Sequence, residues 1–398
     1  MKPVFIDSFT ATTCVGPGNH SLLAALKAGQ SGLAPCEFDK ANIDTWIGKI
    51  SSIDNPENVL PAALSRYECR NNRLAWLGLH QDGFIDSAKD IILRHGATRV
   101  GLFLGTSTSG IYETELAFRT ITPNGAFAGS LNYSGSHSVS SLASFVRDLL
   151  GIEGPSFIIS TACSSSAKVF SSAHRYIELG LIDAAIVGGV DTLCLTTLYG
   201  FNSLQLTSKH PCKPYDATRD GISIGEAAAF CIVSNHPSQD NLHTIKLIGY
   251  GESSDAYHMS SPHPEGLGAQ VAMRTSLKSA SIDAERIDYI NLHGTATPSN
   301  DKAEGYAVNE VFGKKTPCSS TKGITGHTLG AAGAVEAVIS FLALENQLIP
   351  GSAGTVKLDP VIDLNYQLRS NSSPITTVLS NSFGFGGSNC SLVFRIEK

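Results

Sequence analysis

One cysteine and two histidines in this chain lie in settings that could support covalent chemistry. Cys163 stands in Ser160–Ala167, where an apolar run ends and a pattern of helical spacing begins. At a helix N-terminus, unpaired backbone N–H groups and the helix dipole stabilise a thiolate and lower the pKa of a free thiol from about 8.5. The setting therefore predicts a nucleophilic thiolate, with a small buried cysteine that only packs as the alternative.

The two histidines follow apolar segments in a similar way. His293 leads into a turn of Gly, Thr and Pro, and His327 lies in a stretch crowded with Gly and Ala that repeats the layout around Cys163. A thiol nucleophile needs basic groups within reach. A lone histidine after a strand is more often structural, but two of them at Gly-rich strand ends favour one site shared with Cys163.

These turns need strands and helices to bring them together. Alternating apolar runs and amphipathic stretches predict α/β architecture. Cys163 and His327 then occupy equivalent strand–turn–helix positions, as an internal duplication would produce. Buried strands are expected at 100–105, 155–161, 184–190, 245–250, 287–293, 317–321, 376–382 and 390–396, and helices near 20–28, 66–80, 86–95, 137–150, 164–179, 268–281, 300–312 and 328–346.

The polar segment Asn235–Asn241 is the best junction between two parts of similar plan. It predicts an N-terminal half, 1–240, that carries the nucleophile, and a C-terminal half, 241–398, that carries the two histidines. A polar loop within one domain is the alternative.

Composition limits the classes of function. The net charge of −6 gives no overall support for nucleic-acid binding. Nine cysteines at irregular spacing form no CxxC pair and no zinc pattern, so we expect no metal. The apolar run at the N-terminus is too short for a signal peptide, and no stretch approaches the roughly 18 apolar residues of a membrane span. We therefore expect a soluble, cytoplasmic protein with reduced thiols.

Four motifs together resemble one family. They are Thr-Ala-Cys-Ser-Ser around Cys163, His-Gly-Thr-x-Thr-Pro from His293, Lys-x-x-x-Gly-His-x-x-Gly-Ala-Ala-Gly from Lys322, and the Gly-rich segment Asn381–Asn389. In this order they resemble the β-ketoacyl-(acyl carrier protein) synthases of the type I/II branch, within the thiolase-fold condensing enzymes. The resemblance implies a thiolase-like five-layer αβαβα fold built from two related halves, and a dimer.

The resemblance also implies a reaction, a decarboxylative Claisen condensation in two stages. An acyl group passes to Cys163, then malonyl-carrier loses carbon dioxide and attacks it, which gives a β-ketoacyl-carrier two carbons longer in fatty-acid or polyketide/polyene elongation. His293 and His327 would donate hydrogen bonds to the enolate oxygen. The N–H of Cys163 and one from the loop 384–387 would form an oxyanion hole. Substrates would arrive on the phosphopantetheine of acyl carrier protein, with no separate cofactor.

Further roles follow from the resemblance alone. Lys322 and Glu336 match a buried pair that would hold the loop of His327, and Asp301 and Glu304 match structural acidic positions near His293. Thr295 and Thr297 would bind the pantetheine amides, with capping of the next helix as the alternative. The remaining candidates are Phe385 as a gate with Gly386 giving its backbone freedom, Phe201 in a second gating loop, and Ile111 near the region that closes the acyl pocket.

Docking of an acidic carrier requires a local basic patch despite the net negative charge. Arg66, Arg70 and Arg73 fall on one face of the helix expected at 66–80, and Lys213 stands where the family usually has Arg before Pro. An ordinary solvated basic face is the alternative.

Other members of the superfamily fit less well. A thiolase would need a second cysteine in the C-terminal Gly-rich loop, where this chain has Phe385, and an initiating synthase would pair one histidine with an asparagine. A chain-length factor, which is non-catalytic, would lack the nucleophile. The chain could still be the catalytic half of such a heterodimer, since it resembles secondary-metabolite synthases, including the aryl-polyene type, about as much as fatty-acid enzymes. A homodimer and a heterodimer both remain open.

Overall fold

Two sets of five strands with the same order form the frame of the fold. The computed structural model describes residues 1–127, 131–237 and 244–397. One sheet runs β11-β10-β14-β15-β9-β1-β8-β6-β4-β5. Its N-terminal strands are β1 (Val4–Thr13), β4 (Val100–Gly105), β5 (Ser156–Ile159), β6 (Ala184–Asp191) and β8 (Ala227–Ser234), and its C-terminal strands are β9 (Thr244–Ser254), β10 (Tyr289–Asn291), β11 (Cys318–Ser319), β14 (Thr377–Gly384) and β15 (Ser388–Glu397).

The two sets are connected in the same way. Strand β1 pairs antiparallel with β8, β8 antiparallel with β6, and β6, β4 and β5 run parallel. Strands β9, β15, β14, β10 and β11 repeat this sequence of directions. The sets meet where β1 pairs with β9. This repeat supports our proposal of two related halves; its expected boundary between 240 and 241 lies outside the described residues.

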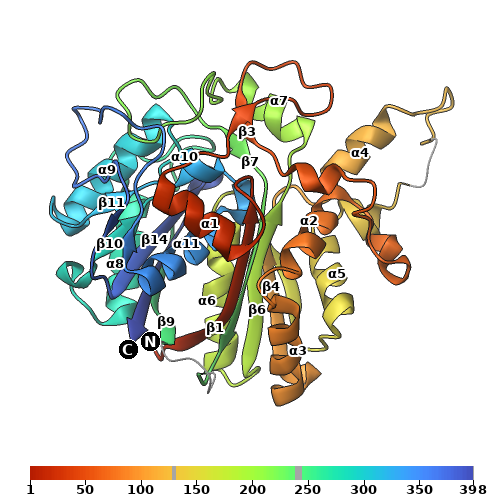
Figure 1. Cartoon of the computed structure of the whole chain (residues 1–398), viewed down its shortest axis with the longest axis horizontal. Helices are drawn as coiled ribbons and strands as arrows, with labels where there is room; N and C mark the ends of the chain where they lie inside the picture. The colour runs from red at the N-terminus through yellow and green to blue at the C-terminus, as the bar shows by residue number, and fades with distance from the viewer. Residues whose placement is uncertain (128–130, 238–243, 398) are drawn as a thin grey trace.

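Helices lie between the two sets and on both outer faces (Figure 1). In the centre, α6 (Ser165–Glu178) and α11 (Ala332–Asn346) pack against each other, with α1 (Gly18–Ala28) beside them. The N-terminal strands are covered outside by α2 (Arg70–Leu79), α3 (Phe84–His95) and α5 (Ser141–Leu150), and the C-terminal strands by α8 (Leu267–Ala280) and α9 (Pro298–Phe312). These are the five layers expected of a thiolase-like fold.

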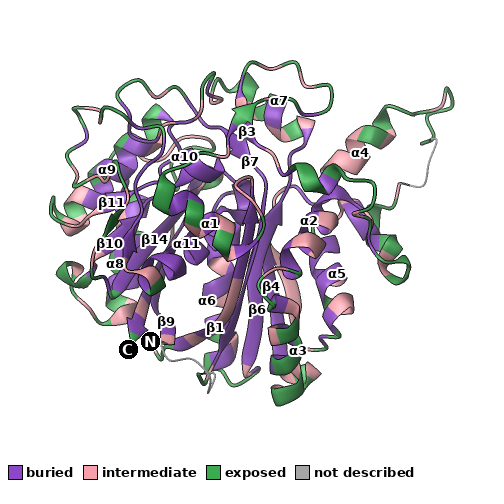
Figure 2. Cartoon of the chain, viewed as in Figure 1, coloured by how far each residue is buried: buried purple, intermediate pink, exposed green. Residues whose placement is uncertain are grey.

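Burial follows these layers (Figure 2). The segment Leu329–Asn346 is long and apolar enough to cross a membrane, but 89% of it is buried inside the fold. A helix that is hydrophobic all round belongs in a core or a membrane. Here the central layer accounts for it, since α11 packs against α6 and against strands of both sets.

Several elements differ from the sequence-based expectation. Strands β1 and β8 were not expected; the residues of β8 are buried on both faces, so it lacks the alternation that marks a half-exposed strand. The helix expected at 66–80 is two elements, a 3₁₀ helix at Ala62–Tyr67 and α2, because Cys69 is extended between them. Helices α4 (Ile111–Phe118), α7 (Leu195–Ser203) and α10 (Lys322–Thr325) were also missed, as were the short strands β2 (Ala34–Pro35), β3 (Trp46–Gly48), β7 (Ile224–Gly225), β12 (Leu348–Ile349) and β13 (Asn371–Ser372).

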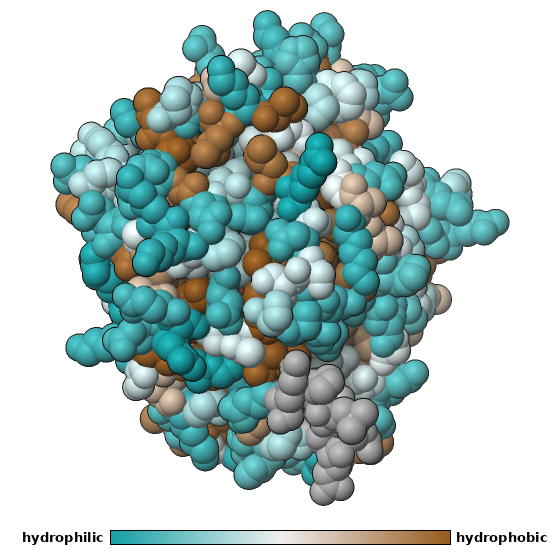
Figure 3. All heavy atoms as spheres, turned by 60° about the vertical axis from the view of Figure 1, so that its left-hand side comes forward, coloured by the Kyte–Doolittle hydropathy of each residue, from teal (hydrophilic) through white to brown (hydrophobic). Residues whose placement is uncertain are grey.

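Exposed apolar side chains are distributed unevenly. The face turned forward in Figure 3 shows them in small groups among hydrophilic side chains. At the opposite side of the molecule, α4 and the residues that follow it up to 127 project from the body (Figure 1). We call this projection the apolar arm; its exposed side chains are Leu116, Phe118, Ile121 and Phe127.

Candidate active site

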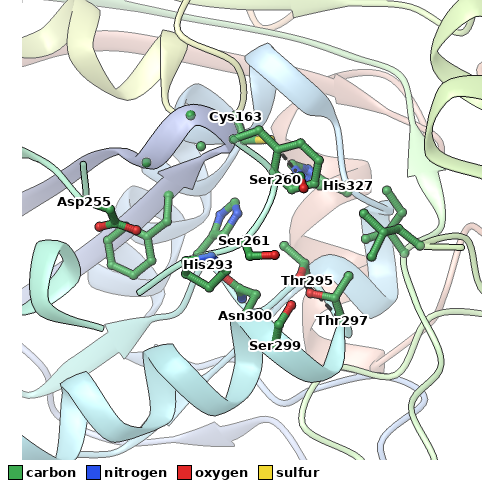
Figure 4. Close-up of a pocket in the computed structure, with 18 of the residues that line it drawn as sticks. Cys163, Asp255, Ser260, Ser261, His293, Thr295, Thr297, Ser299, Asn300 and His327 are labelled. Carbon is green, nitrogen blue, oxygen red and sulfur yellow. Dashed lines mark hydrogen bonds between the residues drawn. The ribbon is translucent and has the colours of Figure 1, made fainter. Parts of the chain in front are cut away.

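Cys163 stands at the turn between β5 and α6, as expected. The residue before it, Ala162, has a positive φ of 52°, a strained conformation for a residue with a side chain that makes the turn sharp. The Cys163 thiol lies 3.0 Å from Nε2 of His327. The side chains of Cys163, His293 and His327 converge, so that the thiol sulfur and one ring nitrogen of each histidine lie within 4.8 Å of one another (Figure 4).

The expectation of a lowered thiol pKa at Cys163 is wrong for the resting site. Burial raises the pKa of this thiol to about 12, although the Lys322 ammonium and the backbone N–H of Phe385 act in the opposite direction. The side chain is only 5% exposed, so water cannot solvate a thiolate. The nucleophile is therefore a protonated thiol until a base takes its proton, and His327 lies at the distance that this transfer requires.

His293 follows β10 and is held by a second set of contacts. Its backbone N–H donates to Glu304 at 2.8 Å, and the Lys322 ammonium lies 3.3 Å from its Nδ1 and 2.5 Å from its carbonyl oxygen. An ammonium has donors but no acceptor, so Nδ1 must be the unprotonated nitrogen. Nε2 of His293 therefore carries the hydrogen, which is the tautomer able to donate toward the substrate.

Lys322 and Glu336 form a fully enclosed ion pair. Lys322 is 2% and Glu336 3% exposed, and the ammonium is bonded to the carboxylate as well as to His293. Ser382 donates to the other carboxylate oxygen at 3.2 Å. The Lys322 ammonium thus contacts His293 directly, and it is connected to His327 only through the backbone of residues 322–327. The expectation was that the pair holds the loop of His327.

Asp301 and Glu304 hold the turn that follows His293. Glu304 accepts hydrogen bonds from the Gly294 N–H at 2.7 Å and from the Tyr215 hydroxyl at 2.9 Å. Asp301 accepts from the backbone N–H groups of Tyr215 and Ala296 at 2.8 and 3.2 Å. These contacts keep the turn in the shape that points His293 at the thiol.

Both active-site histidines are buried, and the pKa of each is held well below 6.5 by burial and by the Lys322 ammonium. They are therefore neutral in the folded protein, while in the unfolded chain they take up protons below about pH 6.5. Because the unfolded state then binds more protons, stability falls as the pH drops through 6.5. Burial raises the pKa of Glu336 to about 7, which has the opposite sign and offsets part of this loss.

Comparison of the wild type with His327→Asn isolates the contribution of His327 to this pH dependence of stability. We expect that lowering the pH from 7.5 to 5.5 reduces the free energy of unfolding of the wild type by about 1.4 kcal/mol more than that of His327→Asn. Denaturant titrations of the two proteins at each pH measure the difference. Equal losses would contradict the low pKa of His327.

A cavity lies above Cys163, His293 and His327 and is lined by all of them. Its walls include Thr295 and Thr297, whose hydroxyl oxygens lie 2.9 Å apart. Thr297 occupies the N-cap position of α9 but makes no side-chain capping bond, so its hydroxyl faces the cavity rather than the helix. Phe201, Phe385 and Gly386 also line it, and the rings of Phe201 and Phe385 are 5.4 Å apart.

Two glycines allow the loop of Phe385 to approach the nucleophile. A Cβ on Gly384 would lie 2.8 Å from the Thr161 carbonyl and 3.2 Å from the Cys163 nitrogen, and Gly386 has a φ of +80°. The loop therefore brings the Phe385 N–H to the thiol. There this N–H lowers the pKa of Cys163, against the larger effect of burial.

Some residues of the cavity were not found from the sequence. Asp255 accepts a hydrogen bond from the Asn389 side chain at 2.7 Å and donates its own N–H to Gly387 at 2.9 Å, which ties the Phe385 loop to the segment after β9. In the sequence, only Asn389 of the Gly-rich motif pointed to this contact. Its partner Asp255 could not be predicted from the spacing of the residues. The other unforeseen lining residues are Leu206, Ile222, Ser260, Ser261, Pro262, Ser299, Asn300 and Phe383.

The prediction of a basic docking face formed by Arg66, Arg70 and Arg73 is wrong in part. The side chain of Arg70 is 4% exposed and lies 3.0 and 2.9 Å from the two carboxylate oxygens of Glu226. Arg66 precedes the break between the 3₁₀ helix and α2, so it shares no helical face with Arg70. Arg66 is bonded to Asp148 and Arg73 to Glu68.

Two further predicted positions lie away from the thiol. The Lys213 ammonium donates to the Thr218 hydroxyl at 2.6 Å, at the surface. Ile111 is half-buried at the start of α4 and does not line the cavity.

Comparison with known proteins fits this geometry. The family described as "Beta-ketoacyl synthase, N-terminal domain" matches residues 1–238, and "Beta-ketoacyl synthase, C-terminal domain" matches residues 245–355. The chain belongs to the β-ketoacyl synthase family. It is accordingly a condensing enzyme of the acyltransferase class.

Individual relatives of this β-ketoacyl synthase cover the whole chain. It is 34% identical to the 3-oxoacyl-[acyl-carrier-protein] synthase 2 of Coxiella burnetii, over 98% of both chains. Among solved structures, it is 37% identical to a ketosynthase (ApeO) in complex with its chain length factor (ApeC) from Xenorhabdus doucetiae, with a TM-score of 0.91 over 100% of this chain and 98% of the other. A β-ketoacyl synthase from Burkholderia phymatum is 27% identical with a TM-score of 0.87, over 100% of both chains.

Proposed function

We propose that this protein catalyses the decarboxylative condensation of an acyl thioester, held on Cys163, with a malonyl thioester on acyl carrier protein. One observation carries the proposal. A buried thiol lies 3.0 Å from one neutral imidazole, and a second imidazole beside it is fixed by Lys322 as a donor from Nε2. This arrangement supplies a nucleophile, a base and a hydrogen-bond donor in one cavity.

In the first stage the Cys163 sulfur attacks the carbonyl of an acyl-carrier thioester. Nε2 of His327 accepts the thiol proton, and this proton passes to the departing carrier thiolate, so the acyl-enzyme forms with no net change in charge. Negative charge develops on the carbonyl oxygen during attack. The N–H groups of Cys163 and Phe385 are proposed to donate to that oxygen, and the loss of one such donor typically costs about 10²–10³ in rate.

In the second stage malonyl-carrier loses carbon dioxide and becomes an enolate. Nε2–H of His293 donates to the enolate oxygen. His327 donates to it after a hydrogen has moved, through solvent, from its Nδ1 to the Nε2 that served as acceptor in the first stage. The enolate carbon then forms a bond to the acyl carbonyl, Cys163 leaves as a thiolate, and a proton from solvent restores the thiol. Neutral imidazoles suit this step, since they donate without needing to be charged.

The substrates arrive as thioesters of acyl carrier protein, so the proposal includes no separate cofactor and no metal. Cys163, His293 and His327 form a set of the kind that can bind a metal ion. The Lys322 ammonium, 3.3 Å from Nδ1 of His293, places a positive charge beside that set and disfavours a cation. Thr295 and Thr297 are proposed to bind the pantetheine arm. The similarity to 3-oxoacyl-[acyl-carrier-protein] synthases supports a cytoplasmic location as part of the proposal.

A second subunit completes the proposal. Strand β5 is the last strand of the sheet, and its residues are only half-buried. It can pair with a strand of another chain, and the apolar arm presents exposed apolar side chains that a second subunit could cover. The similarity to ApeO, solved with its chain length factor, favours a chain-length-factor-like partner over a second copy. Either pathway, fatty-acid or polyketide elongation, uses the same chemistry.

Intact-mass analysis tests the proposed function. The purified chain, alone and with a candidate partner subunit, is mixed with acyl-carrier and then with malonyl-carrier. We expect an acyl mass on Cys163 and a ketoacyl-carrier two carbons longer. Acylation that yields product only with the partner would establish the heterodimer, and no acylation with any donor would overturn the assignment.

Of the residues predicted to dock the carrier, we propose to test Lys213. We expect Lys213→Glu to slow acylation from carrier thioesters about fivefold and to leave acylation from small thioesters unchanged, because reversal of a charge at an interface mainly affects encounter. Lys89→Glu, on the outer helix α3, is the matched charge reversal. Equal loss with both kinds of donor would show that Lys213 acts on the fold instead.

A further inference from the structure

Helix α7 has an N-terminus that its own sequence does not cap. Its N-cap residue, Cys194, makes no side-chain capping hydrogen bond to the helix. The first N–H groups of a helix have no partner within the helix and need an acceptor from elsewhere. In this protein that acceptor comes from a different helix, α4.

Glu115 of α4 supplies it. Its carboxylate accepts hydrogen bonds from the N–H of Leu195 at 2.9 Å, the N–H of Thr196 at 2.6 Å and the Thr196 hydroxyl at 2.6 Å. A carboxylate in this position also interacts favourably with the positive end of the helix dipole. Glu115 therefore fixes the first turn of α7 to α4.

The other end of α7 forms part of the cavity wall. Phe201 lies in its last turn, lines the cavity and packs its ring 5.4 Å from that of Phe385. Leu198, in the middle of α7, is buried in an apolar cluster that also contains Phe201 and Tyr112 of α4. Because α7 has only nine residues, a shift of its first turn displaces Phe201 as well.

We propose that Glu115 is a positioning residue for the gate formed by Phe201 and Phe385. By holding α7 in place, it keeps Phe201 against Phe385 and the entrance to Cys163 closed in the resting protein. That this gate controls acyl entry rests on the proposed function; the control of access to Cys163 does not.

Access to the thiol can be measured without any substrate. Cys163 is 5% exposed, so its alkylation by iodoacetamide, followed by peptide mass spectrometry, reports how often the gate opens. We expect Glu115→Ala to raise the alkylation rate of Cys163 about fivefold, the change in population that loss of one helix cap typically produces. Glu115→Gln keeps one carbonyl acceptor and should give a smaller increase.

Two comparisons separate positioning from a general loss of stability. Asp288 makes the same kind of contacts, accepting from two backbone N–H groups and one hydroxyl of Thr376 and Thr377, and it does not line the cavity. Asp288→Ala should lower the melting temperature as Glu115→Ala does but leave Cys163 alkylation unchanged. If Glu115 acts through Phe201, the double variant Glu115→Ala/Phe201→Ala should react at the rate of Phe201→Ala alone.

Three results would overturn the proposal: an unchanged alkylation rate in Glu115→Ala, an equal increase in Asp288→Ala, or additive effects in the double variant. Failure of the proposed function looks different. In that case no carrier thioester acylates the wild type, and the alkylation rates can still be compared.

Discussion

Cys163→Ala is expected to abolish the acyl-enzyme and to reduce formation of the ketoacyl product by about 10⁴-fold or more, the scale seen when the nucleophile of a covalent mechanism is removed. The physical reason is that no other sulfur of the described residues lines the cavity. No second thiol there can therefore hold the acyl group until the malonyl unit reacts. Intact mass and product analysis under identical conditions give both readouts.

The chain offers a matched control for this experiment. Cys231 is a free cysteine in β8 with no exposed surface, and it does not line the cavity. Cys231→Ala removes the same atom from a core and should lower stability while acylation of Cys163 continues. Product at the wild-type rate from Cys163→Ala would refute a covalent intermediate at this residue.

Lys322→Met is expected to destabilise the fold by about 3–5 kcal/mol, the range for breaking a buried ion pair by removing one partner. The carboxylate of Glu336, 3% exposed, would keep the Ser382 hydroxyl as a partner but lose its counter-charge. Replacing both charges, in Lys322→Met/Glu336→Leu, should recover most of this loss because neither charge is then buried alone. Denaturant unfolding of the three proteins measures the comparison.

The same double variant separates stability from catalysis. It removes the ammonium that fixes the tautomer of His293, so we expect it to fold but to form ketoacyl product about 10²-fold more slowly, with acylation of Cys163 less affected. A double variant as unstable as Lys322→Met would argue against a simple ion-pair account. Wild-type condensation would show that the tautomer does not depend on Lys322.

How far the sequence allowed prediction depends on the range of the interactions involved. The turns of Cys163, His293 and His327 were recognisable because each is a local strand–turn–helix pattern. The parallel neighbours β10 and β11 bring the two histidine turns together, whereas Cys163 follows β5 of the other set and meets them across the central layer. The missed strand β8 has both faces covered, which removes the local alternation that marks a strand. The family and the fold class expected from the four motifs are confirmed by the family comparisons.

Electrostatics were the least predictable part. The spacing of Arg70 from its basic neighbours predicts an exposed side chain. In the structure it is instead bonded to Glu226, which lies far along the chain. The prediction of a lowered thiol pKa at Cys163 was wrong for a related reason. Burial raises this pKa more than the Lys322 ammonium and the Phe385 N–H, both distant in sequence, lower it. Neither burial nor a distant partner leaves a pattern in neighbouring residues.

The matching strand order of the two halves places the active site at the junction of two units of similar plan. The nucleophile begins the central helix of one half, and its histidine partner precedes the central helix of the other. Each set of strands supplies only one of these two side chains, so the pair exists only where the two sets meet. The duplication that we propose would have left each set free to change separately, one toward holding the acyl group and the other toward moving protons.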